Sequence, residues 1–518
     1  MDKILPAWPN ILLALLGAAI LMLAFPDFEY GFLGWFAPIL LIWAVEREKA
    51  SAIRSFAVGW VFGTFFFFGT CWWLTFAPIT YAGFPWWLAY LLFFCVTAVS
   101  GVFPAVFAAV LALLLRRFGR LAWAATPFIW TGTEFLRYWL TGNNWNAIGY
   151  SQAFTPDVLL PASIGGVYLV GFAMFAFSTF VFWSNLELIA AENKRPVYFA
   201  IAVFWGALAV LVALWGPAGK QRSVPNPTAS AQIVAVQPNV PMSGLDQTKW
   251  RERRTRQIEL AEAEIKKLTA DRRQPTTVIL PESPMNYMYN DDREFQQFIH
   301  DFARRNNVNV LFNSAEPDAT NGRYFNSAVM VGPQGSEVGQ YDKIYLLPFG
   351  EAVPWFLDGI LPGFVGNFSY GGEYDLFPLG EARAGVMICF ESHFGQLSRA
   401  YVRNGADVII EMTNDGYLGP TPVLRQHLAN AVFRAVETNR PVLRVTNVGV
   451  TAYIDGRGNI ADAAPTYDEA SRVWAVGRSD GSQTFYVKYG DWFAWLCSMI
   501  SIGLLIFAMA RRSTAPRP

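Results

Sequence analysis

The chain has 518 residues, of which 53% are hydrophobic and only 15% are charged, and its formal net charge is zero. Soluble globular proteins carry about 25% charged residues, so this composition indicates a membrane protein. A neutral chain gives no support for nucleic-acid binding as the main role. With three histidines and no closely spaced Cys/His pairs, we expect no metal site and no cofactor.

Apolar segments long enough for membrane spans occupy both ends of the chain. They are predicted near residues 9–25, 31–46, 55–77, 85–115, 121–139, 163–186, 197–216 and 489–510. Because a span needs roughly 20 residues, the second is short and the fourth is long, with an expected kink at Pro104. We therefore expect an α-helical transmembrane bundle of about eight spans, seven within residues 1–216 and the last within 489–518.

Basic residues predict the orientation of these spans. They follow the second, fourth, sixth and eighth spans, at Arg47, Lys49, Arg54, Arg116, Arg117, Arg120, Lys194, Arg195, Arg511, Arg512 and Arg517. The loops at 26–30 and 78–84 contain neither Lys nor Arg. Since basic loops stay in the cytoplasm, both termini are expected there and residues 217–488 on the opposite side; for a bacterial inner membrane that side would be the periplasm.

The outer segment begins with a Pro-containing linker, Pro217–Ala231, and then alternates β-rich runs with amphipathic helices. Candidate strands are Ile233–Gln237, Thr277–Leu280, Val308–Asn313, Ser327–Val331, Ala384–Cys389, Val408–Met412 and Val442–Thr446. Candidate helices cover 247–270, 292–306, 395–404 and 423–439. This alternation predicts one large layered α/β domain over residues 217–488.

Three expected strand ends present reactive groups: the carboxyl group of Glu282, the amine of Lys343 and the thiol of Cys389. Cys389 is the only cysteine of the outer segment, so an intramolecular disulfide within that segment is excluded. The thiol is then either an inert core residue, the more common case for a single strand cysteine, or a reactive one. An unpaired thiol is also unusual in an oxidising compartment.

The context of these residues carries a family resemblance. Glu, Lys and Cys in this order resemble the nitrilase superfamily. The run KIYLLPFGEAVP at residues 343–354, with the predicted spans, resembles the apolipoprotein N-acyltransferases over almost the whole chain. The resemblance implies a nitrilase-like α-β-β-α sandwich. It also implies transfer of a fatty acyl group from a glycerophospholipid to the α-amino group of an S-diacylglyceryl-cysteine apolipoprotein, the last step of bacterial lipoprotein maturation.

The resemblance assigns roles that fit acyl transfer through a covalent intermediate. Cys389 is expected to attack the ester and carry the acyl group as a thioester. Glu282 is the expected general acid–base, and Lys343, with the backbone amide of Phe390, is expected to stabilise the oxyanion. Glu351 resembles a second essential glutamate of the family, which orients the lysine or shares its proton.

Further residues resemble parts of the family's pocket. Asn326, Asn414 and Tyr417 lie in expected pocket-lining loops, and Trp250 resembles a tryptophan near the mouth of the site. Two positions depart from the pattern: Phe390 stands where Tyr is frequent, and Tyr417 with the following leucine replaces a Trp-Phe pair. Phe390 keeps the aromatic ring and lacks the hydroxyl group.

Apolar or charged residues outside the reactive trio have two interpretations each. The aromatic loop Trp355–Tyr370 is expected to be a mobile lid that admits acyl chains, with a buried core loop as the alternative. Trp145 lies in an outer loop that is expected to line the same path. Glu134 and Arg137 form an expected same-face helical pair, for which contact with a lipid headgroup and simple snorkelling are both open.

The remaining charged residues near the motifs are expected to be structural. Arg434, Glu437, Arg440 and Arg444 are predicted to form an ion-pair network behind the site, and His300, His393 and His427 are interpreted as structural. Two rival functions stay open at this stage. One is a membrane-tethered nitrilase-type amidase, and the other is a non-catalytic binder of lipid or lipoprotein. A monomer is expected.

Overall fold

The computed structural model describes residues 5–190, 195–196, 198, 200–203, 230–273, 276–282, 284–348, 350–352 and 368–510. The chain divides into two units. One, called the helical unit, comprises Met1–Arg222 and Tyr489–Pro518, and the other, called the sheet unit, comprises Ser223–Lys488.

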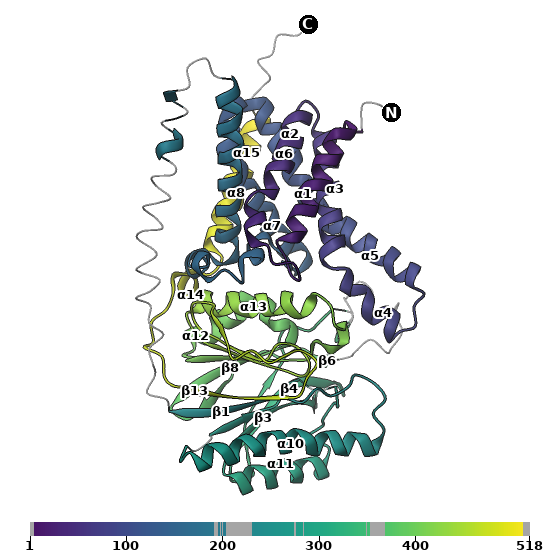
Figure 1. Cartoon of the computed structure of the whole chain (residues 1–518), viewed down its shortest axis with the longest axis vertical. Helices are drawn as coiled ribbons and strands as arrows, with labels where there is room; N and C mark the ends of the chain where they lie inside the picture. The colour runs from purple at the N-terminus through teal and green to yellow at the C-terminus, as the bar shows by residue number, and fades with distance from the viewer. Residues whose placement is uncertain are drawn as a thin grey trace. The chain divides into compact units, whose positions relative to one another are not determined.

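The helical unit is built from apolar α-helices joined by short 3-10 turns (Figure 1). Its α-helices are α1 (Trp8–Leu23), α2 (Ala37–Glu48), α3 (Ala52–Thr70), α4 (Phe76–Thr80), α5 (Trp86–Ser100), α6 (Val102–Phe118), α7 (Thr126–Thr141), α8 (Ala162–Ala190) and α15 (Trp492–Ala510). Proline in the first turn starts α1, α2 and α7, where its missing N–H costs no hydrogen bond. Gly142, in the left-handed conformation, ends α7.

Four stretches of the described chain are long and apolar enough to cross a membrane: Ala52–Thr70, Trp86–Thr141, Ala162–Ala190 and Trp492–Ala510. Helix α1 is apolar but shorter, and α2 has 12 residues. Most of the predicted span at 197–216 lies outside the described residues. The prediction of a membrane part is therefore supported, whereas the count of about eight spans stays a prediction.

The predicted fourth span, 85–115, consists of two helices rather than one. Helices α5 and α6 meet at Gly101, and Figure 1 shows α5 leaving the direction of α6. In a continuous helix the ring of Pro104 would clash with the carbonyl group of Ser100, four residues earlier. This explains why the helix breaks before the proline. Gly63 of α3 faces this break, since a Cβ there would lie 2.9 Å from the Gly101 Cα atom and 2.7 Å from the Pro104 ring.

Glu134 and Arg137 of α7 are both buried within the helical unit. The Glu134 Oε1 atom accepts a hydrogen bond from the Ile148 amide at 2.8 Å, and Arg137 donates to the Trp145 carbonyl at 2.9 Å. The two side chains therefore hold the loop that carries Trp145. Its ring lies 5.4 Å from that of Trp73.

The sheet unit contains two sheets, and each has parallel strands at its centre. The seven-stranded sheet has the order β13-β1-β2-β3-β4-β5, with β6 paired to β4, and the six-stranded sheet has the order β12-β11-β10-β9-β8-β7. The strands are β1 (Ala231–Gln237), β2 (Thr277–Ile279), β3 (Asn309–Pro317), β4 (Tyr324–Val331), β5 (Glu337–Asp342), β6 (Phe368–Ser369), β7 (Leu376–Leu379), β8 (Ala382–Ile388), β9 (Val408–Thr413), β10 (Val442–Thr446), β11 (Ala452–Ile454), β12 (Ile460–Ala461) and β13 (Ala470–Val476).

Helices cover the outer faces of the two sheets. Figure 1 shows α10 (Gln247–Ala270) and α11 (Arg293–Asn306) beside the first sheet, and α12 (Gly395–Arg403) and α13 (Val423–Thr438) beside the second. Apolar residues of α10 and α11 share one buried core with β1, β2, β3 and β4. Helix α12 packs so closely on β8 that a Cβ at Gly385 would lie 2.2 Å from the Tyr401 ring. These layers confirm the predicted α-β-β-α sandwich.

All seven predicted strands and all four predicted helices of this unit are present, with small shifts at their ends. Strands β6, β7, β11, β12 and β13 were not predicted, and of β5 only its end at Lys343 was expected. Strand β5 reads Glu-Val-Gly-Gln-Tyr-Asp, which is too polar to stand out as a strand. The predicted linker residues 217–229 and the greater part of the predicted lid, 355–367, lie outside the described residues.

Candidate active site

Strands from both sheets deliver the three predicted reactive residues to one place. Glu282 follows β2, Lys343 follows β5 directly, and Cys389 follows β8 directly. The Lys343 Nζ atom lies 4.0 Å from Glu282 Oε1. The Cys389 thiol lies close enough to the Glu282 carboxyl group for the two to influence each other's ionisation. A carboxyl group, an ammonium group and a thiol therefore share one small site.

Lys343 is held by Glu351 as well as by Glu282. Its Nζ atom lies 2.8 Å from Glu351 Oε1, and the other oxygen of Glu351 accepts a hydrogen bond from the Leu347 amide at 2.7 Å. The lysine is 1% exposed. Burial disfavours its charge, but Glu351 and Glu282 outweigh that effect and raise the pKa of Lys343 above its ordinary value. The two carboxyl groups therefore favour the charged form of the amine.

Asn326 of β4 links the two glutamates. Its Nδ2 atom donates to Glu351 Oε1 at 2.6 Å and to Glu282 Oε1 at 3.2 Å. Its Oδ1 atom accepts from Asn313 Nδ2 at 2.7 Å, which fixes the orientation of the amide. One side chain thus fixes the positions of both carboxyl groups.

Glu282 is partly buried, and its carboxyl group is hydrogen-bonded. Its Oε2 atom accepts a hydrogen bond from the Asn414 backbone amide at 3.1 Å. Burial raises the pKa of Glu282 above its ordinary value, and the charge of Glu351 acts in the same direction, while Lys343 opposes both. A carboxylate with a raised pKa is a better proton acceptor for a thiol.

Cys389 has an unusual backbone conformation. Its φ angle is +52°, in the left-handed region that non-glycine residues rarely adopt, and it begins the 3-10 turn η7 (Cys389–His393). The side chain is half-buried. Burial and the neighbouring Glu282 raise the pKa of the Cys389 thiol well above its ordinary value, against the effect of Lys343. A resting thiol of this kind needs a base to react.

Comparisons with known proteins agree over both units. The family description "Apolipoprotein N-acyltransferase N-terminal domain" matches residues 17–180, and "Carbon-nitrogen hydrolase" matches residues 236–480. The apolipoprotein N-acyltransferase of Geobacter metallireducens is 30% identical, and the alignment covers 97% of this chain and 96% of that protein. The chain belongs to the apolipoprotein N-acyltransferase family.

Two further relatives illustrate the range of this family. The apolipoprotein N-acyltransferase of Allorhizobium ampelinum is 30% identical over 88% of each chain, and that of Thermotoga maritima is 28% identical over 95% of this chain and 92% of its own. Among solved structures, Nit3 of Saccharomyces cerevisiae, a member of branch 10 of the nitrilase superfamily, matches 55% of this chain and 96% of its own, with 15% identity and a TM-score of 0.37.

Glu391 is a residue of the site that the sequence did not single out. Its Oε1 atom accepts hydrogen bonds from the Tyr341 hydroxyl at 2.8 Å and from the Ile344 and Tyr345 amides at 2.7 and 3.0 Å. Its Oε2 atom accepts from the Ile388 amide at 2.8 Å. The side chain therefore ties the turn that carries the thiol to the turn that carries the lysine.

The burial of Glu391 could have been suspected only from its position two residues after the reactive cysteine. Burial raises its pKa to about 7, although Lys343 and the donors Ile388, Tyr345 and Tyr341 oppose the shift. Because acidic residues in turns are usually solvated, the sequence alone favours the wrong environment for this side chain.

The predicted ion-pair network behind the site consists of separate parts. Arg434 pairs with Glu437 at 2.7 Å, whereas Arg444 pairs with Glu411 at 2.5 Å and with Asp415 at 2.8 Å. The guanidinium group of the remaining member, Arg440, donates to backbone carbonyl groups of Ala406, Asn439 and Ser482.

The other predicted site residues each have their own surroundings. The Asn414 amide contacts Glu282, and Tyr417 is 46% exposed in the neighbouring turn η8 (Asp415–Leu418). The Phe390 ring lies 5.4 Å from that of His393. Trp250 packs at the edge of the α10 core, where its indole N–H donates to the Met285 carbonyl at 3.1 Å. Trp145 belongs to the helical unit.

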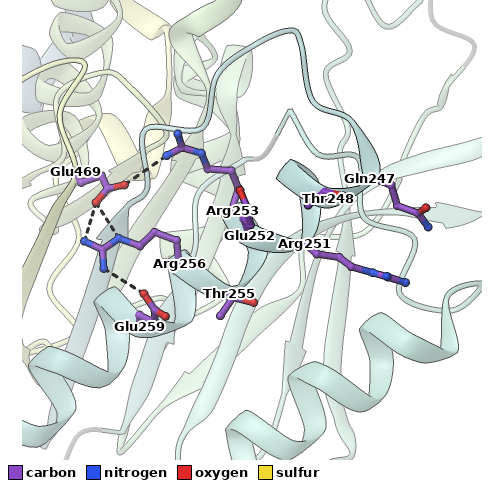
Figure 2. A pocket seen from close by; sticks show the side chains of 9 residues that line it. All are labelled: Gln247, Thr248, Arg251, Glu252, Arg253, Thr255, Arg256, Glu259 and Glu469. Carbon is purple, nitrogen blue, oxygen red and sulfur yellow. Dashed lines mark hydrogen bonds and ion pairs between the residues drawn. The ribbon is translucent and has the colours of Figure 1, made fainter.

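A separate hollow of about 710 Å³ lies along α10 (Figure 2). It is lined by Gln247, Thr248, Arg251, Glu252, Arg253, Thr255, Arg256, Glu259 and Glu469. Figure 2 shows Glu469 between Arg253 and Arg256, with ion pairs of 3.5 and 2.9 Å. Such exposed pairs are ordinary solvated surface, so this hollow is not the candidate active site.

Proposed function

We propose that the protein transfers a fatty acyl group from a glycerophospholipid to the N-terminal α-amino group of an S-diacylglyceryl-cysteine apolipoprotein. The observation that carries this proposal is the convergence of Glu282, Lys343 and Cys389 in a member of the apolipoprotein N-acyltransferase family. These groups are the base, the cation and the nucleophile that acyl transfer through a thioester requires.

The first half-reaction is acylation of Cys389. Glu282 takes the thiol proton, the sulfur attacks the ester carbonyl carbon, and the electron pair of the C=O bond moves to oxygen. The Lys343 ammonium group and the Phe390 N–H stabilise this oxyanion. Collapse of the intermediate breaks the ester C–O bond, and the lyso-phospholipid oxygen leaves with the proton that Glu282 returns.

The second half-reaction is aminolysis. The α-amino group of the apolipoprotein attacks the thioester carbonyl, Glu282 accepts the amine proton, and the C–S bond breaks to form the amide. The thiolate recovers its proton from Glu282. Because the lyso-phospholipid leaves before the apolipoprotein reacts with the acyl-enzyme, the enzyme is expected to show ping-pong kinetics.

The supporting residues have proposed roles that follow from their contacts. Glu351 keeps Lys343 charged and oriented, and Asn326 holds both glutamates. The Asn414 amide orients Glu282. Phe390 contributes its backbone amide. Tyr417, Trp250 and, from the helical unit, Trp145 are proposed to contact the substrates.

The location follows the same proposal. We assign residues 1–216 to seven transmembrane helices, residues 217–488 to a periplasmic catalytic domain, and residues 489–518 to the last transmembrane helix and a cytoplasmic tail. Both termini are placed in the cytoplasm, the membrane is the bacterial inner membrane, and the enzyme is a monomer.

The proposal is tested by intact-mass spectrometry of the detergent-purified enzyme incubated with a phospholipid alone. We expect one acyl adduct on Cys389 and release of one lyso-phospholipid. Cys389→Ala should abolish the adduct, and Cys95→Ala, which removes an exposed cysteine of α5, should retain it. Absence of the adduct, together with turnover of water-soluble amides, would instead favour the amidase interpretation.

A further inference from the structure

His427 contacts the peptide group of the nucleophile. It projects from the first turns of α13, and its side chain is 3% exposed. The Nε2 atom lies 3.0 Å from the Cys389 carbonyl oxygen, and the Nδ1 atom lies 2.6 Å from Asp415 Oδ1. The imidazole therefore bridges the reactive turn η7 and the turn η8.

The partners of His427 define its protonation state. A carbonyl oxygen is only an acceptor, and the Asp415 carboxylate, which is paired with Arg444 at 2.8 Å, is ionised and also only an acceptor. Two ring nitrogens that each face an acceptor must both carry a hydrogen. The side chain is therefore an imidazolium cation.

The charges around the ring support the same state. The groups that face it are Glu411 from β9, at 3.1 Å from Nε2, Asp415 from η8, Arg444 from β10 and the Cys389 turn. The side chains of Glu411, Asp415, Arg444 and His427 itself are all buried. With a charged His427 the two acids and two bases sum to zero, whereas a neutral ring would leave one uncompensated buried charge. Burial alone would lower the pKa of His427, but Asp415 and Glu411 raise it to about 9.

The contact with the Cys389 carbonyl group also affects the backbone N–H of Phe390. The peptide group between Cys389 and Phe390 is planar and trans, so its N–H points opposite to its C=O. Fixing the carbonyl therefore fixes the direction of the Phe390 N–H. A cation bound to the oxygen also polarises the amide and strengthens its N–H as a donor.

We propose that His427 is a positioning residue that aims and polarises the Cys389–Phe390 peptide so that the Phe390 N–H binds the oxyanion. This inference rests on the proposed function, in which that N–H stabilises both tetrahedral intermediates. It also gives a reason for the left-handed conformation of Cys389, which presents the carbonyl to the cation and the amide to the reacting carbonyl group.

Two substitutions separate this role from a general structural one. In H427Q the Gln amide nitrogen replaces Nε2 and keeps a donor toward the Cys389 carbonyl, whereas in H427N the Asn amide nitrogen replaces Nδ1 and loses that contact. Both remove the charge. His300→Gln, which removes a histidine of α11 bonded to Tyr289, is the matched control and is expected to act like the wild type.

Two rates are measured for each variant. One is single-turnover acylation by a phospholipid, which needs the oxyanion site, and the other is alkylation of Cys389 by iodoacetamide, which does not. We expect acylation to fall about 100-fold in H427N and about tenfold in H427Q, because loss of one oxyanion donor costs about 10²- to 10³-fold. Alkylation should differ between the two variants by less than about threefold, since both lose the same charge.

The outcomes are decisive in each direction. Equal acylation losses in H427N and H427Q, acylation losses that match the alkylation losses, or no loss at all would overturn the role of His427. If H427N does not fold, as judged by its thermal melt, H427Q decides alone by the same comparison of its two rates. Absence of any acyl adduct in the wild type would overturn the proposed function itself, which distinguishes the two failures.

Discussion

Replacing Glu282 by glutamine removes a negative charge beside the thiol while nearly preserving the shape of the side chain. At 4.0 Å, the Glu282–Lys343 interaction is worth about 4 kcal/mol at an effective dielectric constant of 20. Lys343 keeps its second partner, Glu351, at 2.8 Å and so stays charged. E282Q therefore removes the base and leaves the cation in place.

The two consequences for Cys389 have opposite signs. Without its base, acylation by phospholipid should slow by about 10²- to 10⁴-fold, the usual contribution of general acid–base catalysis. Without the carboxylate that now raises it, the pKa of the thiol should fall, so alkylation by iodoacetamide should reach half its maximum at a lower pH. Single-turnover mass spectrometry gives the first quantity, and the pH profile of alkylation gives the second.

The matched control is Glu252→Gln, which removes an exposed glutamate of α10 in the same unit. It should change neither measurement. Acylation of E282Q at a near wild-type rate would exclude Glu282 as the base. A thiol pKa that rises in E282Q would refute the electrostatic account of the site.

Three further predictions concern residues around this trio. Asn326→Leu removes one hydrogen bond from each of Glu282 and Glu351, and should lower the free energy of unfolding by about 2–4 kcal/mol, measured by denaturant titration in detergent. Glu391→Gln places an NH₂ group against backbone donors, so the free energy of unfolding should fall by about 2 kcal/mol. The variant should melt at a lower temperature and lose acylation. The pKa of His427 in the folded protein is raised to about 9, so its charged form stabilises the fold by about 3 kcal/mol. This contribution is present below pH 6.5 and is lost as the pH rises through 9. The melting temperature of the wild type should therefore fall more than that of H427Q between pH 7 and 9.5. A stable Asn326→Leu protein, a fully active Glu391→Gln enzyme or parallel pH profiles would contradict these expectations in turn.

Much of the sheet unit could be predicted because strand and helix periodicities follow from local sequence. The ends of β2, β5 and β8 are visible as apolar or motif-bearing runs that stop at a polar residue, and this places Glu282, Lys343 and Cys389. The polar β5 was found through its motif rather than through its composition. That the three ends meet is a property of the two-sheet topology, and the family resemblance supplied it.

What escaped prediction depends on contacts between distant segments. Nothing near His427 in the sequence indicates that α13 brings its ring to the carbonyl of a residue 38 positions earlier. Similarly, the sequence does not indicate that Glu391 accepts hydrogen bonds from the Tyr341 hydroxyl and the Ile344 amide, which come from β5 and the turn after it. Glu134 and Arg137 were expected as a same-face helical pair; that both are buried and also hold the loop backbone at 145–148 could not be predicted.

The grouping of two carboxylates around one ammonium group has a consequence for how charge moves during the reaction. Glu282, Glu351 and Lys343 together carry one negative charge at rest. When Glu282 takes the thiol proton, this group becomes neutral and the negative charge passes to sulfur, so the total is conserved within a few ångströms. Each later transfer relocates that same single charge. The proposed cycle can therefore run without counter-ions or reorganised solvent, which suits a catalyst whose substrates are lipids.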